Sequence, residues 1–157
     1  MADLGLTAKE VEEVERTWGI VSQNLKHHGI NLFMALFTEY PKYKEYFKRF
    51  AGIATEDLPK TAALKAHAST FMHGMASFVD SIDEKETLVR IIHDAVGRHH
   101  KRKIGAEQFR NTLNLVLPYL TDALGSELTP DGASGWKKVL DTLVVVIEAE
   151  TKRLGSE

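Results

Sequence analysis

Hydrophobic residues recur at steps of three and four along most of the chain, the spacing that places side chains on one face of an α-helix. The first stripe follows Thr7 and Glu10, which have the spacing of a capping box at a helix start. Its members are Val11, Val14, Trp18, Val21 and Leu25. We therefore predict a first helix from about Thr7 to the low twenties.

A second stripe begins after Gly29 and ends at Pro41, because proline disfavours a helical conformation in the residue before it. Its members are Ile30, Phe33, Phe37 and Tyr40. A short helical piece that carries Phe47 and Phe50 should follow it. Residues 51–58 show little periodicity, which predicts a loop.

Pro59 predicts the start of a long helix, because proline suits the first helical turn. The stripe of this helix is Leu64, His67, Phe71, Met75, Phe78 and Ile82. Asp83 and Glu86 indicate the cap of the next helix, whose apolar face leads into His99. That face consists of Leu88, Ile92 and Ala95.

The remaining pattern predicts two more helices. Beyond Gly105, one helix should bend at Pro118 and end at Gly125, a residue type common at helix C-termini. Its stripe is Phe109, Leu113, Val116, Leu117 and Leu120. The last helix should begin at Pro130, and the continuous apolar run at residues 143–147 indicates packing on several sides. Its stripe is Trp136, Leu140, Leu143 and Ile147.

About six substantial helices and one or two short ones, with no strand pattern, predict an all-α protein. No long non-periodic stretch divides the 157 residues, so residues 1–157 should form one domain. Hydrophobic residues make up 43% and charged residues 27%, as in ordinary soluble proteins. The net charge of −2 gives no field that would recruit nucleic acid, and the basic run after His99 is too short to change this.

No apolar run approaches the roughly 20 residues of a membrane span, so we expect no membrane partner. The absence of cysteine excludes disulfides, thiolate metal sites and a cysteine nucleophile, and it fits an intracellular protein. The first fifteen residues lack the basic start and apolar core of a signal peptide, which favours the cytoplasm. No nucleophile beside a base, glycine-rich phosphate loop or zinc-ligand spacing is present, so we expect no hydrolytic or transfer enzyme.

Two of the seven histidines, His67 and His99, lie on apolar helix faces. The other candidates, His27, His28, His73 and His93, should lie in solvent. A single histidine at a helix end is most often solvated. Two buried imidazoles without partners would each cost about 1–3 kcal/mol. One flat metal-bearing ligand between the two helices would satisfy both rings.

At this point the sequence resembles the globin family over nearly the whole chain. Trp18 and Trp136 match the helix-packing tryptophans of the family, and Pro41 followed by Phe47 matches its short third helix and the phenylalanine that contacts haem. His67, twenty residues later, resembles the distal histidine. The segment RHHKRKIGAEQF resembles the part of the family that carries the proximal histidine.

Two registers are open for that proximal ligand. The downstream isoleucine and phenylalanine, at five and ten residues, select His99, and so does the apolar face that leads to it. The sequence VGRHH also resembles the Leu-Gly-x-x-His approach of the family, which selects His100. We take His99 as the predicted ligand and keep His100 as the alternative.

The resemblance implies a globin fold around haem b, with His99 on the iron and His67 on the distal side, either on the iron or hydrogen-bonded to bound O2. It further implies that Phe33, Phe47 and Phe71 enclose the cofactor. The expected function is reversible binding of O2 and other diatomic ligands by a monomer or homo-oligomer. The alternatives are haem redox chemistry (NO dioxygenation, peroxidase activity or sulfide binding) and a cofactor-free helical module that binds a protein.

Overall fold

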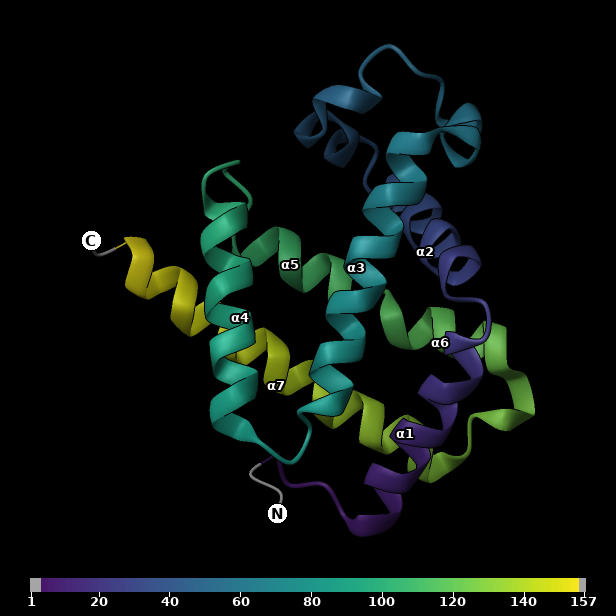
Figure 1. The fold of residues 1–157 in the computed structure, drawn as a ribbon, viewed down its shortest axis with the longest axis vertical. Helices are drawn as coiled ribbons and strands as arrows, with labels where there is room; N and C mark the ends of the chain where they lie inside the picture. The colour runs from purple at the N-terminus through teal and green to yellow at the C-terminus, as the bar shows by residue number, and fades with distance from the viewer. Residues whose placement is uncertain (1–3, 156–157) are drawn as a thin grey trace.

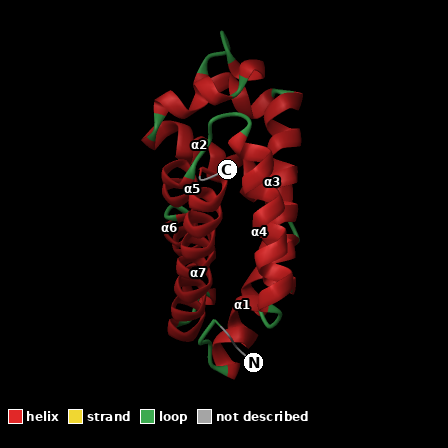
Figure 2. Ribbon diagram, turned by 90° about the vertical axis from the view of Figure 1, so that its left-hand side faces the viewer, coloured by secondary structure: helices red, strands yellow, loops and turns green. Residues whose placement is uncertain are grey.

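The computed structural model describes residues 4–155, and in this range helices are the only regular elements (Figures 1 and 2). The α-helices are α1 (Ala8–Ser22), α2 (Leu25–Glu39), α3 (Ala62–Asp80), α4 (Lys85–His100), α5 (Ala106–Leu113), α6 (Val116–Leu124) and α7 (Pro130–Gly155). Four short 3₁₀ segments join them: η1 (Pro41–Tyr46), η2 (Lys48–Phe50), η3 (Thr55–Lys60) and η4 (Gly125–Glu127). The all-α prediction is confirmed.

The start of α1 is the capping box that the sequence predicts. The hydroxyl of Thr7 accepts a hydrogen bond from the backbone N–H of Glu10 at 3.1 Å, and the Glu10 carboxylate accepts one from the N–H of Thr7 at 2.8 Å. These two bonds satisfy two of the four N–H groups that a helix start leaves without partners.

The predicted start of α3 at Pro59 is wrong. Pro59 lies inside η3, which also occupies part of the predicted loop at residues 51–58. The helix begins after Thr61, whose hydroxyl accepts a hydrogen bond from the backbone N–H of Leu64 at 3.2 Å. Proline lacks a side-chain oxygen that could accept this bond, and its fixed φ suits a 3₁₀ turn equally well.

The predicted cap of α4 at Asp83 is also wrong. The helix begins at Lys85, and Glu84 holds the cap position without a side-chain hydrogen bond to the helix. The chain therefore turns within residues 81–84, where backbone hydrogen bonds to Ser77, Phe78, Val79 and Ser81 close the connection.

The single bent helix expected around Pro118 is two helices, α5 and α6. The chain breaks at Asn114 and Leu115, before the proline. Pro118 is the third residue of α6, where the missing N–H has no intrahelical partner to lose. Gly125 ends α6 with a φ of +54°, as expected for a glycine at a helix end.

Helix α7 packs along α1 through two tryptophans. The ring of the fully buried Trp136 lies 6.0 Å from that of Trp18, and its Nε1 donates a hydrogen bond to Thr17 Oγ1 at 2.8 Å. Farther along α7, Leu143 and Ile147 are buried, but Val145 is 66% exposed. The prediction that this helix packs on several sides is confirmed, because α7 contacts α1, α4, α5 and α6, and Val145 lies on its open side.

Helices α3 and α4 form one layer of the molecule, and α5, α6 and α7 lie behind them (Figures 1 and 2). Helix α2 crosses α3 at Gly29, where a Cβ atom would lie 2.7 Å from Met72 Cγ and 3.0 Å from the Ala68 carbonyl oxygen. This close crossing brings the side of α2 that carries Phe33 against the side of α3 that carries His67. None of the helices within residues 4–155 has both the length and the apolar character needed to cross a membrane.

Candidate functional site

A cavity of about 190 Å³ lies between α2, α3, α4, α5, α7 and η1. Its lining is mostly aliphatic and aromatic, and it includes both His67 and His99. One water molecule needs only about 10–15 Å³ measured in this way, so the cavity has room for a large organic group. The structure therefore brings the two histidines of the apolar faces to one site.

His67 lies on α3 between two phenylalanine rings. Its ring centroid is 4.6 Å from those of both Phe33 and Phe47, with the rings edge to face. Within the described range, residues 4–155, the imidazole forms no hydrogen bond. Burial, followed by the charges of His99 and Arg102, lowers the pKa of His67 to about 4. The ring is therefore neutral near pH 7, with one N–H and one lone pair available to a ligand.

His99 lies in the last turn of α4, with its Nδ1 2.7 Å from the carbonyl oxygen of Ala95. A carbonyl oxygen only accepts, so Nδ1 carries the proton and Nε2 carries the lone pair. Burial lowers the pKa of His99, and the bond to Ala95 opposes that effect. The ring also packs edge to face on Phe109, with centroids 4.9 Å apart. This arrangement fixes the tautomer that metal binding through Nε2 requires.

His100 does not share this cavity. Its side chain is exposed, and it is absent from the residues that line the cavity in the described part of the chain. Neighbouring side chains on a helix point about 100° apart, so only one of the pair faces inward. The geometry places His99 at the site with His67.

Phe33, Phe47 and Phe71 all line the cavity, as the sequence predicts. The ring of Phe33 packs edge to face on that of Phe71, with centroids 5.1 Å apart and an interplanar angle of 84°. Phe33 is buried, whereas Phe47 and Phe71 are partly exposed. The three rings form one aromatic wall around His67.

The sequence analysis missed the polar lining on η1 and α5. The hydroxyl of Tyr46 accepts a hydrogen bond from Gln108 Nε2 at 3.2 Å, and that of Tyr43 accepts one from Asn111 Nδ2 at 2.8 Å. Both tyrosines line the cavity. The available signal was the spacing of Tyr40, Tyr43 and Tyr46 around Pro41, which matches three residues per turn of a 3₁₀-helix.

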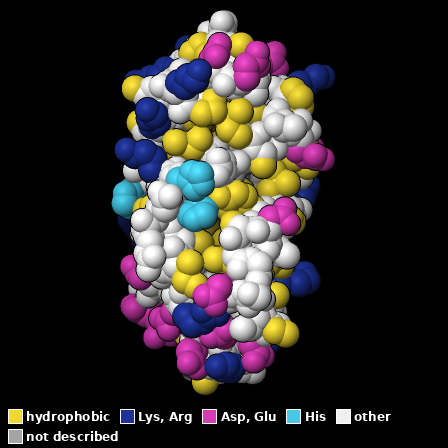
Figure 3. All heavy atoms as spheres, turned by 90° about the vertical axis from the view of Figure 1, so that its right-hand side faces the viewer, with side chains coloured by type: hydrophobic (Ala, Val, Ile, Leu, Met, Phe, Trp, Pro, Cys, Tyr) yellow, Lys and Arg dark blue, Asp and Glu magenta, His cyan; other side chains and the backbone are white. Residues whose placement is uncertain are grey.

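Two of the four histidines expected in solvent are partly buried and have partners on other helices instead. His28 Nδ1 lies 2.6 Å from the hydroxyl of Tyr119, and burial lowers the pKa of His28. His93 Nδ1 lies 2.8 Å from a carboxylate oxygen of Glu150. His27 and His73 are exposed, as predicted. Figure 3 shows histidine side chains among hydrophobic atoms on the face that holds α2 and α6.

The family model described as Globin matches residues 30–147, a range that holds α3, α4, α5 and the whole cavity lining. The chain belongs to the globin family. Its fold, predicted from the pattern of helices and from the resemblance, is confirmed as a globin fold.

This globin is similar to curated relatives over most of its length. A globin of Nerita albicilla is 26% identical over 149 residues, which are 95% of each chain. Cytoglobin-1 of Oryzias latipes is 30% identical over 153 residues, or 96% of this chain and 86% of the relative. The structure of a hexacoordinated heme protein from an anhydrobiotic tardigrade superposes with a TM-score of 0.87 over 95% of this chain and 97% of that one. The two sequences are 18% identical, so this comparison shows that the two proteins share a fold and nothing more.

The cofactor of this globin is haem, and the cavity fits it. A porphyrin needs an apolar enclosure, which the aromatic wall and the aliphatic side chains of α4 and α5 supply. Its iron needs an imidazole nitrogen with a free lone pair, and the bond from His99 to Ala95 leaves Nε2 in that state. The globin therefore binds gaseous ligands at haem.

Proposed function

We propose that this globin, as a single domain over residues 1–157, binds O2 reversibly at ferrous haem for storage or transport in the cytoplasm, and that it is not an enzyme. The observation that carries the proposal is the unequal state of the two imidazoles in the cavity. The His99 ring is fixed by the Ala95 carbonyl, whereas the His67 ring has no hydrogen-bond partner within residues 4–155.

His99 is the residue that would hold the iron, through Nε2. The haem iron supplies reversible binding of diatomic ligands when the cofactor is present. The backbone bond of Nδ1 keeps the ring oriented and raises the basicity of Nε2. His100, the alternative ligand, would have to turn inward from an exposed position, and the geometry argues against it.

His67 would act on the opposite side of the cofactor. Its neutral ring can donate an N–H hydrogen bond to a ligand that carries partial negative charge, as O2 does on ferrous haem. Phe33 and Phe47 hold the ring at 4.6 Å on two sides, so its position needs little further ordering. Direct binding of His67 to the iron is the competing arrangement in the absence of a ligand.

The aromatic wall would protect the site from water. Phe33, Phe47 and Phe71 present apolar surface around His67, and water that reaches the iron promotes its oxidation. A dry site also strengthens any hydrogen bond from His67, because the effective dielectric constant is low. Both effects favour reversible binding of O2 over redox turnover.

The test is repeated exposure of the ferrous protein to O2 and nitrogen, followed by visible absorption. We expect the O2 and ligand-free spectra to alternate over several cycles with little ferric protein. Rapid formation of ferric protein on contact with O2 would contradict storage or transport. Sustained consumption of NO or peroxide, at a rate that exceeds the release of O2, would assign the protein to haem redox chemistry.

A further inference from the structure

The side chain of Gln108, in the first turn of α5, forms two hydrogen bonds in different directions. Its Oε1 accepts one from the backbone N–H of Gly105 at 2.8 Å, and its Nε2 donates one to the hydroxyl of Tyr46 at 3.2 Å. A backbone N–H only donates, so the bond to Gly105 determines which end of the amide is oxygen and directs Nε2 to Tyr46. The amide therefore joins the turn before α5 to η1, at the edge of the cavity that both side chains line.

The first bond connects Gln108 to the turn that follows His99, residues 101–105. In this turn, the backbone N–H groups of Arg102 and Ile104 both donate to the carbonyl oxygen of His99, at 2.9 and 3.2 Å. Ile104 also lines the cavity. The next N–H along the chain is the one that Gln108 holds, so the amide acts on the backbone that bonds to His99.

The turn is held in one strained conformation. Lys103 has a φ of +63°, which no other residue except glycine adopts in the described range 4–155. A side chain makes this conformation unfavourable, and it persists only where the surrounding structure determines it. The N–H of Lys103 donates to the carbonyl oxygen of His100 at 3.0 Å, and the bonds to His99 close the same turn. A turn fixed in this way passes a displacement at its end on to His99.

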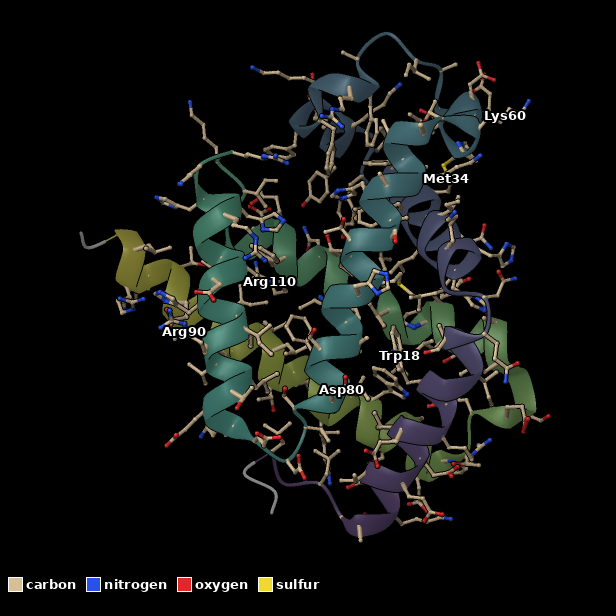
Figure 4. All side chains as sticks on the ribbon, viewed as in Figure 1. Trp18, Met34, Lys60, Asp80, Arg90 and Arg110 are labelled. Carbon is tan, nitrogen blue, oxygen red and sulfur yellow. The ribbon has the colours of Figure 1, made fainter. Side chains whose placement is uncertain are left out.

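The second bond connects Gln108 to the aromatic wall. Tyr46 immediately precedes Phe47, whose ring centroid lies 4.6 Å from that of His67. The main neighbours of η1 are α2 and η2, so the hydrogen bond to Gln108 is a link to a helix on another side of the cavity. In Figures 1 and 4, the turn after α4 and the short segments before α3 lie at the same end of the molecule, with side chains between them.

A second pair of side chains also joins η1 to α5. Asn111 Nδ2 donates to the hydroxyl of Tyr43 at 2.8 Å, one turn beyond Gln108, and Tyr43 also lines the cavity. Among the described residues, however, the side chain of Asn111 has no hydrogen bond to the turn after α4. The two pairs are alike in chemistry and differ in what the α5 residue holds, which makes Tyr43 a matched control for Tyr46.

We propose that Gln108 is a positioning residue that couples the two histidines of the cavity. Through Gly105 it holds the turn that follows His99, and through Tyr46 it holds the phenylalanine that packs on His67. The proposal rests on the roles that the proposed function gives to the two histidines. The connection runs through protein groups alone, so a change in η1 should alter the orientation of His99.

The test compares Tyr46→Phe with Tyr43→Phe in the ferric cyanide form of the holoprotein. Cyanide occupies the distal position of the iron, so the coordination is the same in all variants. The paramagnetic iron shifts the proton NMR signal of the His99 Nδ1–H, and the position of the signal reports the orientation of the ring. We expect Tyr46→Phe to move this signal, although no hydrogen bond or ring contact within the described residues joins Tyr46 to His99. Tyr43→Phe should leave it at the wild-type position.

Stability separates coupling from a merely structural role. Each variant loses one hydroxyl and one neutral hydrogen bond, so the equilibrium constant for unfolding should rise about twofold to tenfold in both. On the distal side, the C–O stretching band of the ferrous CO complex responds to the field of His67. Tyr46→Phe should broaden or split this infrared band, because Phe47 and His67 then sample more than one position.

A double-mutant cycle assigns the effect to the bond. Gln108→Leu should move the His99 signal as well, and Tyr46→Phe added to it should change the signal little further, because the bond is already lost. Equal positions of the signal in Tyr46→Phe and Tyr43→Phe would overturn the proposal, and so would additive shifts in the cycle.

The O2 cycles of the preceding section, run on the wild type, test the proposed function separately. Failed O2 cycles together with a shifted His99 signal in Tyr46→Phe would remove reversible O2 binding and keep the coupling. Normal cycles with an unchanged signal would keep the proposed function and remove the coupling.

Discussion

His99 Nδ1 donates a hydrogen bond to the carbonyl oxygen of Ala95, one turn earlier in α4, over 2.7 Å. Ala95 precedes the last four residues of α4, whose carbonyls a helix leaves without N–H partners, so its oxygen accepts the imidazole N–H with a second lone pair. The bond therefore fixes the imidazole tautomer through the backbone of the same helix. It also explains how a small residue such as Ala95, without a hydroxyl of its own, can orient a histidine through its backbone.

The first prediction concerns the residue that anchors haem. His99→Ala should lose the cofactor or need added imidazole to retain it, because no other imidazole of α4 lines the cavity in the described part of the chain. His100→Ala should have almost no effect, since His100 is exposed. Haem transfer to an apoprotein acceptor, followed by absorption, measures both. The reverse result would assign the ligand to His100.

The second prediction concerns the distal hydrogen bond. His67→Leu should accelerate O2 dissociation roughly tenfold to a hundredfold, because a bond to a partly charged ligand contributes about 1.5–3 kcal/mol. Bound CO carries less negative charge, so its dissociation should change much less. Stopped-flow ligand replacement measures both rates. An equal change for the two ligands would show that His67 does not donate to the ligand.

The third prediction concerns the aromatic wall. Phe71→Val removes several carbons from the wall and from the contact with Phe33 at 5.1 Å, which should destabilise the fold by about 1–3 kcal/mol. The opened space should admit small ligands faster and give water a path to the polar edge of His67. CO association after flash photolysis and autoxidation in air should therefore both accelerate. Unchanged rates would show that Phe71 only fills core.

The capping box of Thr7, the apolar stripes and the positions of His67 and His99 could be predicted because each depends on residues close in sequence. A hydrophobic stripe at three- and four-residue steps indicates which side of a helix is buried, and the two histidines continue such stripes. Predicting that both histidines line the same cavity also required their spacing from Pro41 and Phe47, because periodicity does not indicate which helices face each other.

The partners of His28 and His93 could not be predicted. Tyr119 is 91 positions from His28, and Glu150 is 57 positions from His93. Both bonds cross between helices whose relative placement is set by packing of the whole core. The break between α5 and α6 was missed for a related reason: both helices bury the same stripe, so two non-helical residues at Asn114 and Leu115 leave the periodicity nearly intact.

The fourth prediction concerns acid stability. Glu10 and Glu13 are buried carboxylates at the contact of α1 with the start of α7. The bond from Lys138 lowers the pKa of Glu10, and the bond from Arg16 lowers that of Glu13, each from 4.5 to about 2. Since these pKa values are depressed in the folded state, their stabilisation is complete above about pH 4.5 and is lost as the pH falls towards 2.

Urea unfolding of the holoprotein at several pH values tests this. Glu10→Gln should lower the free energy of unfolding at pH 6, and the difference from the wild type should shrink steadily between pH 4.5 and 2. The exposed Glu15 provides the control, and Glu15→Gln should have little effect over the same range. A difference that stays constant with pH would show that the carboxylate of Glu10 acts through packing and not through its charge.

The last prediction concerns the crossing of α2 and α3. Gly29→Ala would place a Cβ atom 2.7 Å from Met72 Cγ and 3.0 Å from the Ala68 carbonyl oxygen. Met72 can move aside, but the backbone of α3 cannot, so the helices must separate slightly. Overpacking of this kind costs about 1–3 kcal/mol. Phe33 and His67 lie on the two crossing helices, and their ring centroids are 4.6 Å apart. Separation of the helices should therefore also change the rate of O2 dissociation.

Gly19→Ala is the matched control, because Gly19 lies on the exposed side of α1 and a Cβ atom there has no neighbour within 4 Å among the described residues. Alanine in place of an exposed mid-helix glycine should stabilise the fold by roughly 0.5–1 kcal/mol. The two substitutions are chemically identical, so opposite signs of the change in unfolding free energy would isolate the effect of close packing. If both variants gain stability and Gly29→Ala leaves the O2 dissociation rate unchanged, the crossing has more space than the structure shows, and it does not set the distance between Phe33 and His67.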